Sequence, residues 1–250
     1  MGLLDRIAYR YLDYRSKLRL TKDIFLYGQI YSKDKSFPER PNLLNTIPKK
    51  INYVWLGGNK KPDLIKRCIN SWHIFLPDWE IKEWNESNFP FNEYEFSKGA
   101  MQQKRWAFAA DVARIHAVYF NGGICLDTDM EVLKPLEPLL NQAGFACREG
   151  HRAISFGVVG AVQYHPLLRD MLLWYKHIKF SFDYGDISST RIMAKIIKQK
   201  YNPQFNKEEA TTINHMTIYP ESYFLPHKID ENKFDVKDNT YTIHYGTGLW

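Results

Sequence analysis

Hydrophobic and polar positions follow two different periods along the chain, and the changes between them predict helices and strands in turn. Apolar residues at three- and four-residue steps predict helices, whereas short apolar runs that end in glycine or polar residues predict strands. Strands interleaved with helices predict an α/β fold with a mostly parallel central sheet flanked by helices. The expected helices cover residues 3–20, 63–75, 102–120, 166–179 and 189–200. The expected strands cover residues 50–58, 79–85, 124–133, 144–148, 153–162 and the chain from residue 240.

Proline residues divide the chain near its start. Pro38 and Pro41 break any helix in the polar stretch that follows the first helix. We therefore expect residues 1–45 to form an N-terminal helix with a connector, and residues 46–250 to form one folded domain. Asp63 directly follows a proline and is expected to cap the helix that begins there.

The composition is that of a globular protein. Hydrophobic residues make up 44% of the chain and charged residues 25%, which excludes a wholly disordered chain. The sequence has neither an apolar run long enough to cross a bilayer nor the apolar core of a secretory signal. Its three cysteines form no CxxC pair, which argues against a disulfide framework or a structural zinc site. These features predict a reduced, cytoplasmic protein; the cysteines are Cys68, Cys125 and Cys147.

The positive charge is concentrated at the N-terminus. Residues 1–22 hold six basic and two acidic residues, which gives them +4 of the net charge of +6. The remainder is nearly neutral, so no nucleic-acid surface is expected. Residues 3–20 combine an apolar stripe with flanking arginines and lysines, as an interfacial helix on the inner face of an anionic membrane requires. The same stripe also fits a helix that packs on the folded domain.

The strongest local signal is Asp127-Thr128-Asp129, at the end of an apolar strand. Two carboxylates one residue apart can converge on one hard divalent cation, one directly and one through water or a hydroxyl. Such a cation commonly carries a diphosphate, whose charge it neutralises. Because an Asp-x-Asp pattern arises about once by chance in a chain of this composition, the pattern alone also fits a solvated turn.

The preceding helix adds a second pair of polar residues. Asp111 and Arg114 lie three positions apart and therefore on one helix face. An aspartate can accept sugar hydroxyls and an arginine can hold a phosphate, although the pair also fits an ordinary surface ion pair. Gly122 and Gly123 allow a sharp turn from this helix into the aspartate-bearing strand and are expected to bring the backbone close to a ligand.

Three stretches together resemble the DXD-containing glycosyltransferases of family 32. They are IPKKINYVWLGG, ADVAR and NGGICLDTDMEVLKPL, within residues 46–140, and HYGTGLW at the C-terminus shows a weaker similarity. That family includes capsule and polysaccharide enzymes, yeast-type initiating mannosyltransferases and, more distantly, the catalytic domains of clostridial glucosylating toxins. The resemblance implies a GT-A-like fold, a nucleotide-sugar donor, a divalent ion (manganese or magnesium) and retention of anomeric configuration.

The resemblance also implies a metal site. Asp129 would be the main protein ligand, Asp127 would meet ribose, sugar or metal, and His244 would be a metal or phosphate partner. A lone histidine on a strand also fits a structural role.

Further residues would bind the donor. Asp111 and Arg114 would contact the donor sugar and its phosphate, and both are expected to take part in catalysis together with the two aspartates of the DXD motif. Trp55 would stack on the nucleobase, and Trp250 would close over the diphosphate. The sequence departs from the family at Ala110, where serine is common. It also departs before Trp250, where Gly248 and Leu249 replace the usual serine.

Taken together, these residues predict a metal-dependent retaining hexosyltransferase. A UDP-sugar is the favoured donor and a GDP-sugar such as GDP-mannose is its competitor. The expected acceptor is a glycan or a lipid-linked saccharide, in bacterial surface polysaccharide synthesis at the cytoplasmic face of the membrane. Residues 148–165 are expected to line the acceptor side, with Arg148, Glu149 and His151 as polar candidates. The same stretch also fits a connector without such a role.

Two other functions fit parts of the sequence. LDTDMEV is similar to the opening motif of haloacid-dehalogenase phosphatases, in which Asp127 would be the nucleophile and the next aspartate the general acid. Residues 1–22 would also suit a non-catalytic basic module that docks on a membrane. A simple ester assay separates the phosphatase from the transferase, and binding of a nucleoside diphosphate separates the transferase from the docking module.

Overall fold

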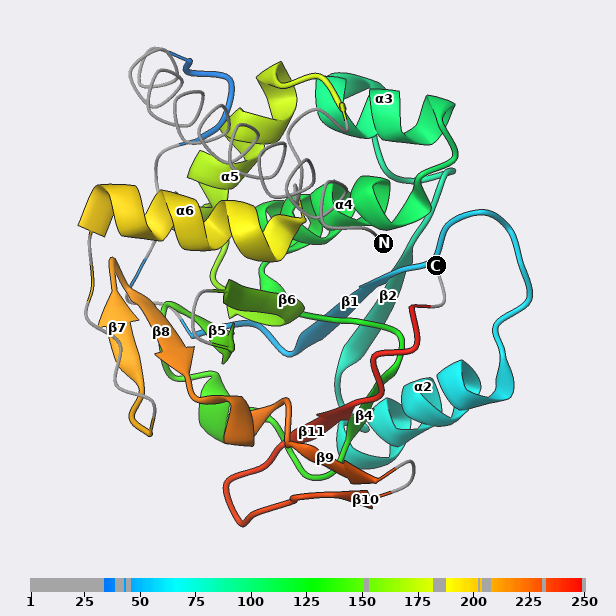
Figure 1. Ribbon diagram of the computed structural model, residues 1–250, viewed down its shortest axis with the longest axis vertical. Coiled ribbons are helices and arrows are strands. Elements are labelled where there is room, and N and C mark those ends of the chain that lie inside the picture. Colours follow the sequence, from blue (N-terminus) through cyan, green and yellow to red (C-terminus); the bar gives the residue numbers. More distant parts are fainter. Residues whose placement is uncertain are drawn as a thin grey trace, which may run out of the picture.

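The structure is a computed structural model that describes residues 34–38, 43, 46–150, 153–181, 188–201, 203, 208–230 and 233–248 of the 250-residue chain. Within these ranges helices are interspersed with strands (Figure 1). The α-helices are α2 (Asp63–Phe75), α3 (Glu95–Gln102), α4 (Trp106–Asn121), α5 (Pro166–His177) and α6 (Ser189–Tyr201). The strands are β1 (Lys50–Val54), β2 (Glu80–Trp84), β3 (Gly123–Leu126), β4 (Met130–Val132), β5 (Gly144–Glu149), β6 (Ala153–Ala161), β7 (Thr211–Ile213), β8 (Met216–Tyr219), β9 (Lys228–Asp230), β10 (Lys233–Phe234) and β11 (Thr242–His244). Short 3₁₀ helices are η1 (Phe91–Glu93), η2 (Glu137–Leu139) and η4 (Glu221–Tyr223).

A seven-stranded sheet in the order β2-β1-β3-β6-β5-β8-β7 forms the centre of the described structure. Five strands run in one direction, and β6 and β7 run against them. The carboxyl ends of β1, β3, β5 and β8 therefore share one edge of the sheet, which is where open α/β sheets bind ligands. This arrangement confirms the predicted α/β class with a mostly parallel central sheet flanked by helices.

Apolar cores cover both faces of this sheet. Figure 1 shows α3, α4, α5 and α6 on one side of it and α2 on the other. On one face, α3, α4, α5 and α6 pack together through fully buried side chains such as Val112 and Leu172. On the other face, Trp72 of α2 is fully buried and donates from its indole N–H to the carbonyl of Met130 at 2.8 Å. Burial of one such side chain contributes about 2–3 kcal/mol, so α2 is fixed beside β4.

Most of the predicted elements form within a few residues of their expected bounds, and α2 matches residues 63–75. The expected capping role of Asp63 is wrong, because Pro62 holds the N-cap position without a side-chain cap. Asp63 is instead the first helical residue, and its carboxylate accepts a hydrogen bond from Lys66 at 2.9 Å.

The predicted strand 124–133 is two strands in two different sheets. β3 belongs to the central sheet, whereas β4 pairs with β11. The chain turns between them, because the N–H of Met130 donates to the carbonyl of Asp127 at 3.0 Å. The two aspartates of the DXD motif therefore lie in a turn rather than along a strand.

The predicted helix 102–120 begins later, at Trp106, and a separate helix α3 precedes it. Lys104 separates the two helices with a left-handed backbone, at φ 54°. Such a conformation ends a right-handed helix, and a lysine gives little sign of it in the sequence. The small sheet of β9 and β10 and the outer strands β7 and β8 were also not predicted.

Gly122 and Gly123 form the expected sharp turn, but their close neighbours belong to the protein rather than to a ligand. Their φ angles are 65° and 94°. A Cβ atom at position 123 would lie 2.6 Å from the carbonyl oxygen of Lys50, and one at position 122 would lie 2.8 Å from Pro48. Glycine is required here because α4 and β3 meet the start of β1 at close range.

Other predictions lie partly outside the described residues. Residues 3–20 are among those not described, and the division between residues 1–45 and 46–250 stays a prediction. In the described part of the chain no helix combines the length and the apolar character needed to cross a membrane.

The cysteines are free, in agreement with the predicted absence of disulfides; Cys68, Cys125 and Cys147 are all buried.

Candidate metal and donor site

The two aspartates of the DXD motif lie at the carboxyl end of β3, in the turn that leads to β4. β4 pairs with β11 in antiparallel register, which sets His244 opposite Met130. The backbone N–H of Tyr245 then donates to the carbonyl of Asp129 at 3.1 Å. Backbone pairing thus holds the C-terminal segment against the motif.

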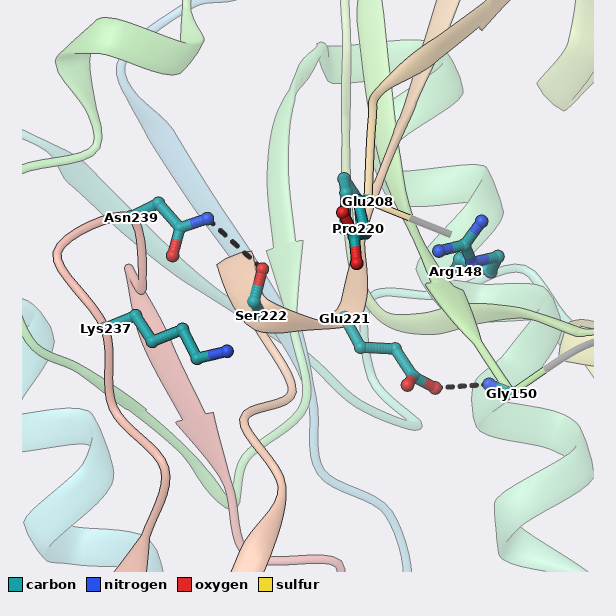
Figure 2. A pocket seen from close by; sticks show the side chains of 8 residues that line it. All are labelled: Arg148, Gly150, Glu208, Pro220, Glu221, Ser222, Lys237 and Asn239. Atoms are coloured by element: carbon teal, nitrogen blue, oxygen red, sulfur yellow. Dashed lines mark hydrogen bonds between the residues drawn. The ribbon is translucent and has the colours of Figure 1, made fainter. Parts of the chain in front are cut away.

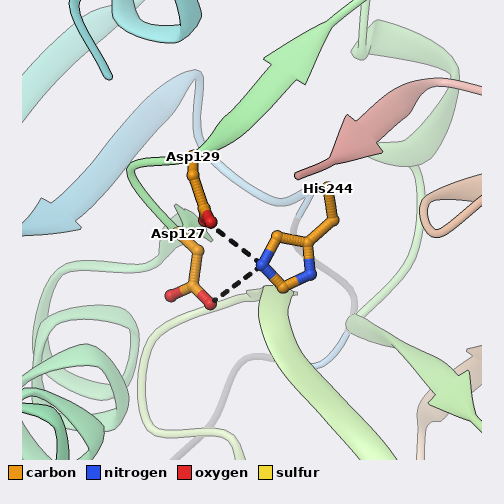
Figure 3. Close-up of side chains that lie close together, drawn as sticks. All are labelled: Asp127, Asp129 and His244. Atoms are coloured by element: carbon orange, nitrogen blue, oxygen red, sulfur yellow. Dashed lines mark ion pairs between the residues drawn. The ribbon is translucent and has the colours of Figure 1, made fainter. Parts of the chain in front are cut away.

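Asp127, Asp129 and His244 converge on one point, as Figure 3 shows. The imidazole Nε2 of His244 lies 3.2 Å from Asp129 Oδ1 and 3.8 Å from Asp127 Oδ2. One ligand atom from each of the three residues lies within 4.8 Å of the other two. Gly157 on β6 leaves room for this group, because a Cβ atom there would lie 3.3 Å from Asp127 Oδ2.

These three residues fit a divalent cation. Two carboxylate oxygens and one imidazole nitrogen are a donor set that such ions accept. Asp129 Oδ1 and His244 Nε2 are buried and, among the described residues, make no hydrogen bond although they face each other. Buried polar atoms are nearly always satisfied, and a shared cation would satisfy both. Asp127, Asp129 and His244 are the residues that the sequence predicts for a metal site.

A threonine holds the other oxygen of Asp129. Thr247 donates to Asp129 Oδ2 from its backbone N–H at 2.8 Å and from its hydroxyl at 2.9 Å. Burial alone would raise the pKa of Asp129, but the neighbouring His244 and the two bonds from Thr247 outweigh it and lower the pKa to about 2. Asp129 is therefore a carboxylate at neutral pH, ready to bind a cation.

Arg114 of α4 lies between two buried carboxylates. Its guanidinium pairs with Asp111 on one side and with Asp127 on the other. Ser189 at the start of α6 completes this chain of contacts, because it donates to Asp111 from its backbone N–H at 3.0 Å and from its hydroxyl at 2.8 Å. The contacts thus run from α6 through α4 to the end of β3.

The charges of this buried cluster favour a cation. Asp111, Asp127 and Asp129 carry three formal negative charges against the one positive charge of Arg114, and each of the four residues is less than a tenth exposed. Uncompensated charge is costly in a buried place, so a divalent ion beside Asp127 and Asp129 would balance the cluster.

Trp55 lies near the same edge of the sheet. β1 runs parallel to β3 with Asn52 beside Cys125, so Trp55, just beyond the end of β1, is close to the level of the DXD turn. Its ring is half-buried, its indole N–H donates to the carbonyl of Asn59 at 2.7 Å, and the Lys61 ammonium lies 5.5 Å from the ring centre. Stacking of Trp55 on a nucleobase stays a prediction.

The remaining predicted site residues lie elsewhere or outside the description. Arg148 is buried and Glu149 exposed at the end of β5, two strands from β3 in the central sheet. His151 and Trp250 are among the residues that the structure does not describe. The acceptor role of the first two and the closing role of Trp250 therefore stay predictions.

Two residues that hold the site were not predicted. Thr247 stands between His244 and Trp250, next to the positions where serine is usual in the family, and that neighbourhood is a signal that could have suggested it. Ser189 could have been recognised only as the start of a helix. Its partner is 78 positions away, and nothing in the local sequence indicates the contact.

Comparison with known proteins matches the segment that carries Asp111, Arg114, Asp127 and Asp129. Residues 62–146 match a family model described as "Glycosyltransferase sugar-binding region containing DXD motif". Inositol phosphoceramide mannosyltransferase 3 of Schizosaccharomyces pombe is 26% identical over 182 residues, which are 70% of this chain and 47% of that protein. Inositol phosphoceramide mannosyltransferase 2 of the same yeast is 25% identical over 220 residues, 74% of this chain and 62% of that protein.

Solved structures give a looser likeness. The PaToxG glycosyltransferase has a TM-score of 0.49 at 14% identity and covers 76% of this chain and 81% of that chain. A glycosyltransferase involved in the glycosylation of the major capsid of PBCV-1 has a TM-score of 0.34 at 12% identity and covers 69% of this chain and 82% of that chain.

The resemblance to DXD-containing glycosyltransferases is thus confirmed, because residues 62–146 match the model of their sugar-binding region. The matches support a transferase. The chain spans about half the length of the first curated relative that it matches. The expected place in bacterial polysaccharide synthesis stays a prediction, because the curated relatives are yeast proteins whose names refer to inositol phosphoceramide.

Proposed function

We propose that this chain is a metal-dependent glycosyltransferase that moves a hexosyl group from a nucleotide-diphosphate sugar to a hydroxyl group of its acceptor, with retention of configuration. The observation that carries this proposal is the convergence of Asp127, Asp129 and His244 at the carboxyl end of β3, beside the buried Arg114. The DXD sugar-binding match over residues 62–146 supports it.

In this proposal Asp127, Asp129 and His244 hold a manganese or magnesium ion. The bound ion supplies neutralisation of the donor diphosphate and of the charge that develops on the leaving nucleotide. Thr247 fixes one oxygen of Asp129 and leaves the other directed at His244. Arg114 fixes Asp127 from the opposite side.

Asp111 and Arg114 are proposed to orient the donor sugar and its phosphate. Ser189 and Arg114 both contact Asp111, which fixes the direction of its carboxylate. Each carboxylate oxygen can accept more than one hydrogen bond, so Asp111 can still accept a sugar hydroxyl. A buried and prearranged carboxylate selects a sugar by the position of its hydroxyl groups.

Mannose is the first candidate for the transferred sugar. The curated relatives are named mannosyltransferases, and the donor would then be GDP-mannose. The similarity of YVWLGG to the toxin domains favours a UDP-sugar instead. In both cases we propose that Trp55 stacks on the base, a contact that contributes about 1–3 kcal/mol.

The proposed acceptor is a hydroxyl-bearing saccharide, either a glycan or a sugar carried on a lipid. The names of the yeast relatives refer to a lipid headgroup that contains inositol, which extends this class to hydroxyl-rich rings on lipids.

Replacement of the main metal ligand tests the mechanism. Asp129→Asn keeps the shape of the side chain but loses its charge, so manganese binding should weaken strongly and donor hydrolysis should fall by orders of magnitude. The exposed Asp78→Asn variant is the matched control and should behave as the parent protein. Near-normal turnover of the Asp129 variant, with a circular dichroism spectrum like the parent, would refute the proposal.

The donor base can be identified without an acceptor. Thermal stabilisation by UDP and by GDP, each with manganese, would be compared in the parent protein and in a Trp55→Ala variant. Stabilisation by GDP alone would exclude the uridine donor, and the reverse result would exclude GDP-mannose. Equal stabilisation of the parent and the Trp55 variant would remove the stacking role.

We also propose that residues 1–22 attach the enzyme to an anionic membrane surface. The support is the net charge of +4 in this segment and its apolar stripe. Flotation with anionic vesicles, compared before and after deletion of residues 1–20, tests it. Flotation that survives the deletion, or intact protein that never floats, would contradict this attachment.

A further inference from the structure

A polar pocket lies on the described surface, at the carboxyl ends of β5 and β8 (Figure 2). Its volume is about 450 Å³, enough for a monosaccharide ring. Arg148 and Gly150 line it from the end of β5, and Glu221 and Ser222 line it from η4 after β8. Further lining residues come from the segment between β10 and β11, namely Lys237 and Asn239.

This pocket and the metal site share one edge of the sheet. β3, β5 and β8 run in the same direction, and β6 separates β3 from β5. At about 4.8 Å per strand, the ends of β5 and β8 are roughly 10–15 Å from the end of β3. Residues 237–247 connect the two places, because this segment lines the pocket at Lys237 and Asn239 and reaches the metal site at His244.

The walls of the pocket are braced in place. The hydroxyl of Thr240 donates to the carbonyl of Ser222 at 2.7 Å and accepts the N–H of Lys237 at 2.9 Å. The Glu221 carboxylate accepts the backbone N–H of Gly150. The pocket is therefore formed before any ligand binds, which lowers the entropy cost of binding.

One polar atom of a pocket residue has no hydrogen-bond partner among the described residues. The amide of Asn239 donates to the Ser222 hydroxyl at 3.2 Å, while its Oδ1 is buried and makes no hydrogen bond to any described residue. If the amide were turned over, its nitrogen would take that place instead, so one amide atom stays unpaired in both orientations. Asn239 lines the pocket, so a ring bound there would lie against this amide group.

The charges of the pocket indicate what kind of ligand it suits. The two cations Arg148 and Lys237 are matched by the two anions Glu208 and Glu221. A balanced pocket gives no net attraction to a phosphate, whereas carboxylates, an amide and an ammonium together suit the hydroxyl groups of a neutral ring.

We infer that this pocket binds the acceptor, as a neutral hydroxyl-rich ring held by Asn239 and Lys237 beside the metal site. The inference rests on the proposed function, and it gives the expected acceptor side at Arg148 a defined ligand. Because the pocket lies roughly 10–15 Å from the end of β3, an acceptor longer than one ring could reach from it to the donor.

Binding of neutral rings to the metal-free protein tests this without any donor chemistry. The probes are methyl α-D-mannopyranoside and myo-inositol, with inositol 1-phosphate as the anionic comparison, measured by saturation-transfer NMR. We expect at least one neutral ring to bind and Asn239→Ala to weaken it by about tenfold, the worth of one good hydrogen bond. Lys237→Gln, at an exposed side chain, should weaken binding severalfold and guards against a folding defect in the first variant.

Asn92→Ala on the exposed η1 is the matched control and should bind as the parent does. The inference is overturned if neither neutral ring binds, if only the phosphate binds, or if both pocket variants bind like the parent. With donor, manganese and a short mannose oligosaccharide that extends from the pocket, both pocket variants should also lower the ratio of sugar transfer to donor hydrolysis. Failure of the proposed function would appear differently, as absence of donor hydrolysis in the parent protein, and would leave the binding result standing.

Discussion

Thr247 donates both its backbone N–H and its hydroxyl to the same carboxylate oxygen of Asp129, at 2.8 and 2.9 Å. The two residues are 118 positions apart, and the pairing of β11 with β4 brings them together. One oxygen of Asp129 is thereby fixed, and the other is left facing His244. Groups that orient a metal ligand in this way contribute strongly to metal affinity.

Thr247→Val should therefore weaken metal binding while the fold is kept. The valine has the shape of threonine but lacks the hydroxyl, so one of the two bonds to Asp129 is lost. We expect manganese affinity to fall about tenfold, measured by electron paramagnetic resonance without donor. Thr212→Val on the exposed strand β7 is the matched control. Unchanged affinity in the Thr247 variant would show that Asp129 needs no orientation by its neighbour.

Ser189→Ala should impair donor turnover through Asp111. The variant loses the hydroxyl contact of 2.8 Å, so the buried carboxylate is less firmly placed against Arg114. We expect kcat/KM for donor hydrolysis to fall about tenfold, the effect of one buried hydrogen bond to a charged group. Ser87→Ala in an exposed turn serves as the control.

A double-mutant cycle separates a positioning role of Ser189 from a merely structural one. If Ser189 acts through Asp111, the Ser189→Ala change should have little further effect in an Asp111→Asn background. Full additivity of the two changes would mean that Ser189 affects turnover by another route.

The sequence predicted most of the framework because local patterns determine it. α2, α5 and α6 follow from apolar spacing, and β1, β3, β5 and β6 follow from short apolar runs next to glycine or polar residues. The break at Lys104 and the division of residues 124–133 into two strands depend on long-range packing. Neither a lysine with a left-handed backbone nor an apolar run whose two halves join different sheets leaves a pattern in the local sequence.

The same distinction holds for the site. Asp127 and Asp129 are adjacent in the sequence and could be recognised together, and Asp111 with Arg114 follows from helical spacing. His244 was assigned from the family resemblance and from the suitability of histidine as a ligand, because no spacing rule links it to residues more than a hundred positions earlier. The contacts of Ser189 and Thr247 depend on the tertiary fold in the same way and were not predicted.

Gly123→Ala should destabilise the protein much more than Gly58→Ala. Both glycines have a left-handed backbone, but a Cβ atom at position 123 would lie 2.6 Å from the Lys50 carbonyl oxygen, whereas position 58 has no neighbour within 4 Å. We expect the free energy of unfolding to fall by about 3 kcal/mol or more at position 123 and by about 1 kcal/mol at position 58. Urea unfolding followed by fluorescence measures both, and equal losses would contradict the close contact of β3 with β1.

Two buried histidines should make the protein less stable in mild acid. His116 shares a hydrogen bond of 2.7 Å with the Tyr94 hydroxyl inside an aromatic cluster, and His165 is fully buried before α5. Burial, with a smaller contribution from Lys82, lowers the pKa of His116 to about 4, and burial likewise lowers the pKa of His165 to about 4.

The direction of the effect follows from proton uptake. Between about pH 6.5 and pH 4 the unfolded chain binds protons at these imidazoles and the folded chain does not, so the free energy of unfolding decreases as the pH falls through this window. Each histidine should contribute a slope of up to about 1.4 kcal/mol per pH unit.

His116→Phe removes one of these two histidines and should flatten the slope relative to the parent, even if its stability at pH 7 is lower. The exposed His73→Gln variant should keep the parent slope. Urea unfolding at half-unit steps from pH 4.5 to 7 measures this difference, and parallel curves for the parent and the His116 variant would show that His116 is not held neutral in the folded protein.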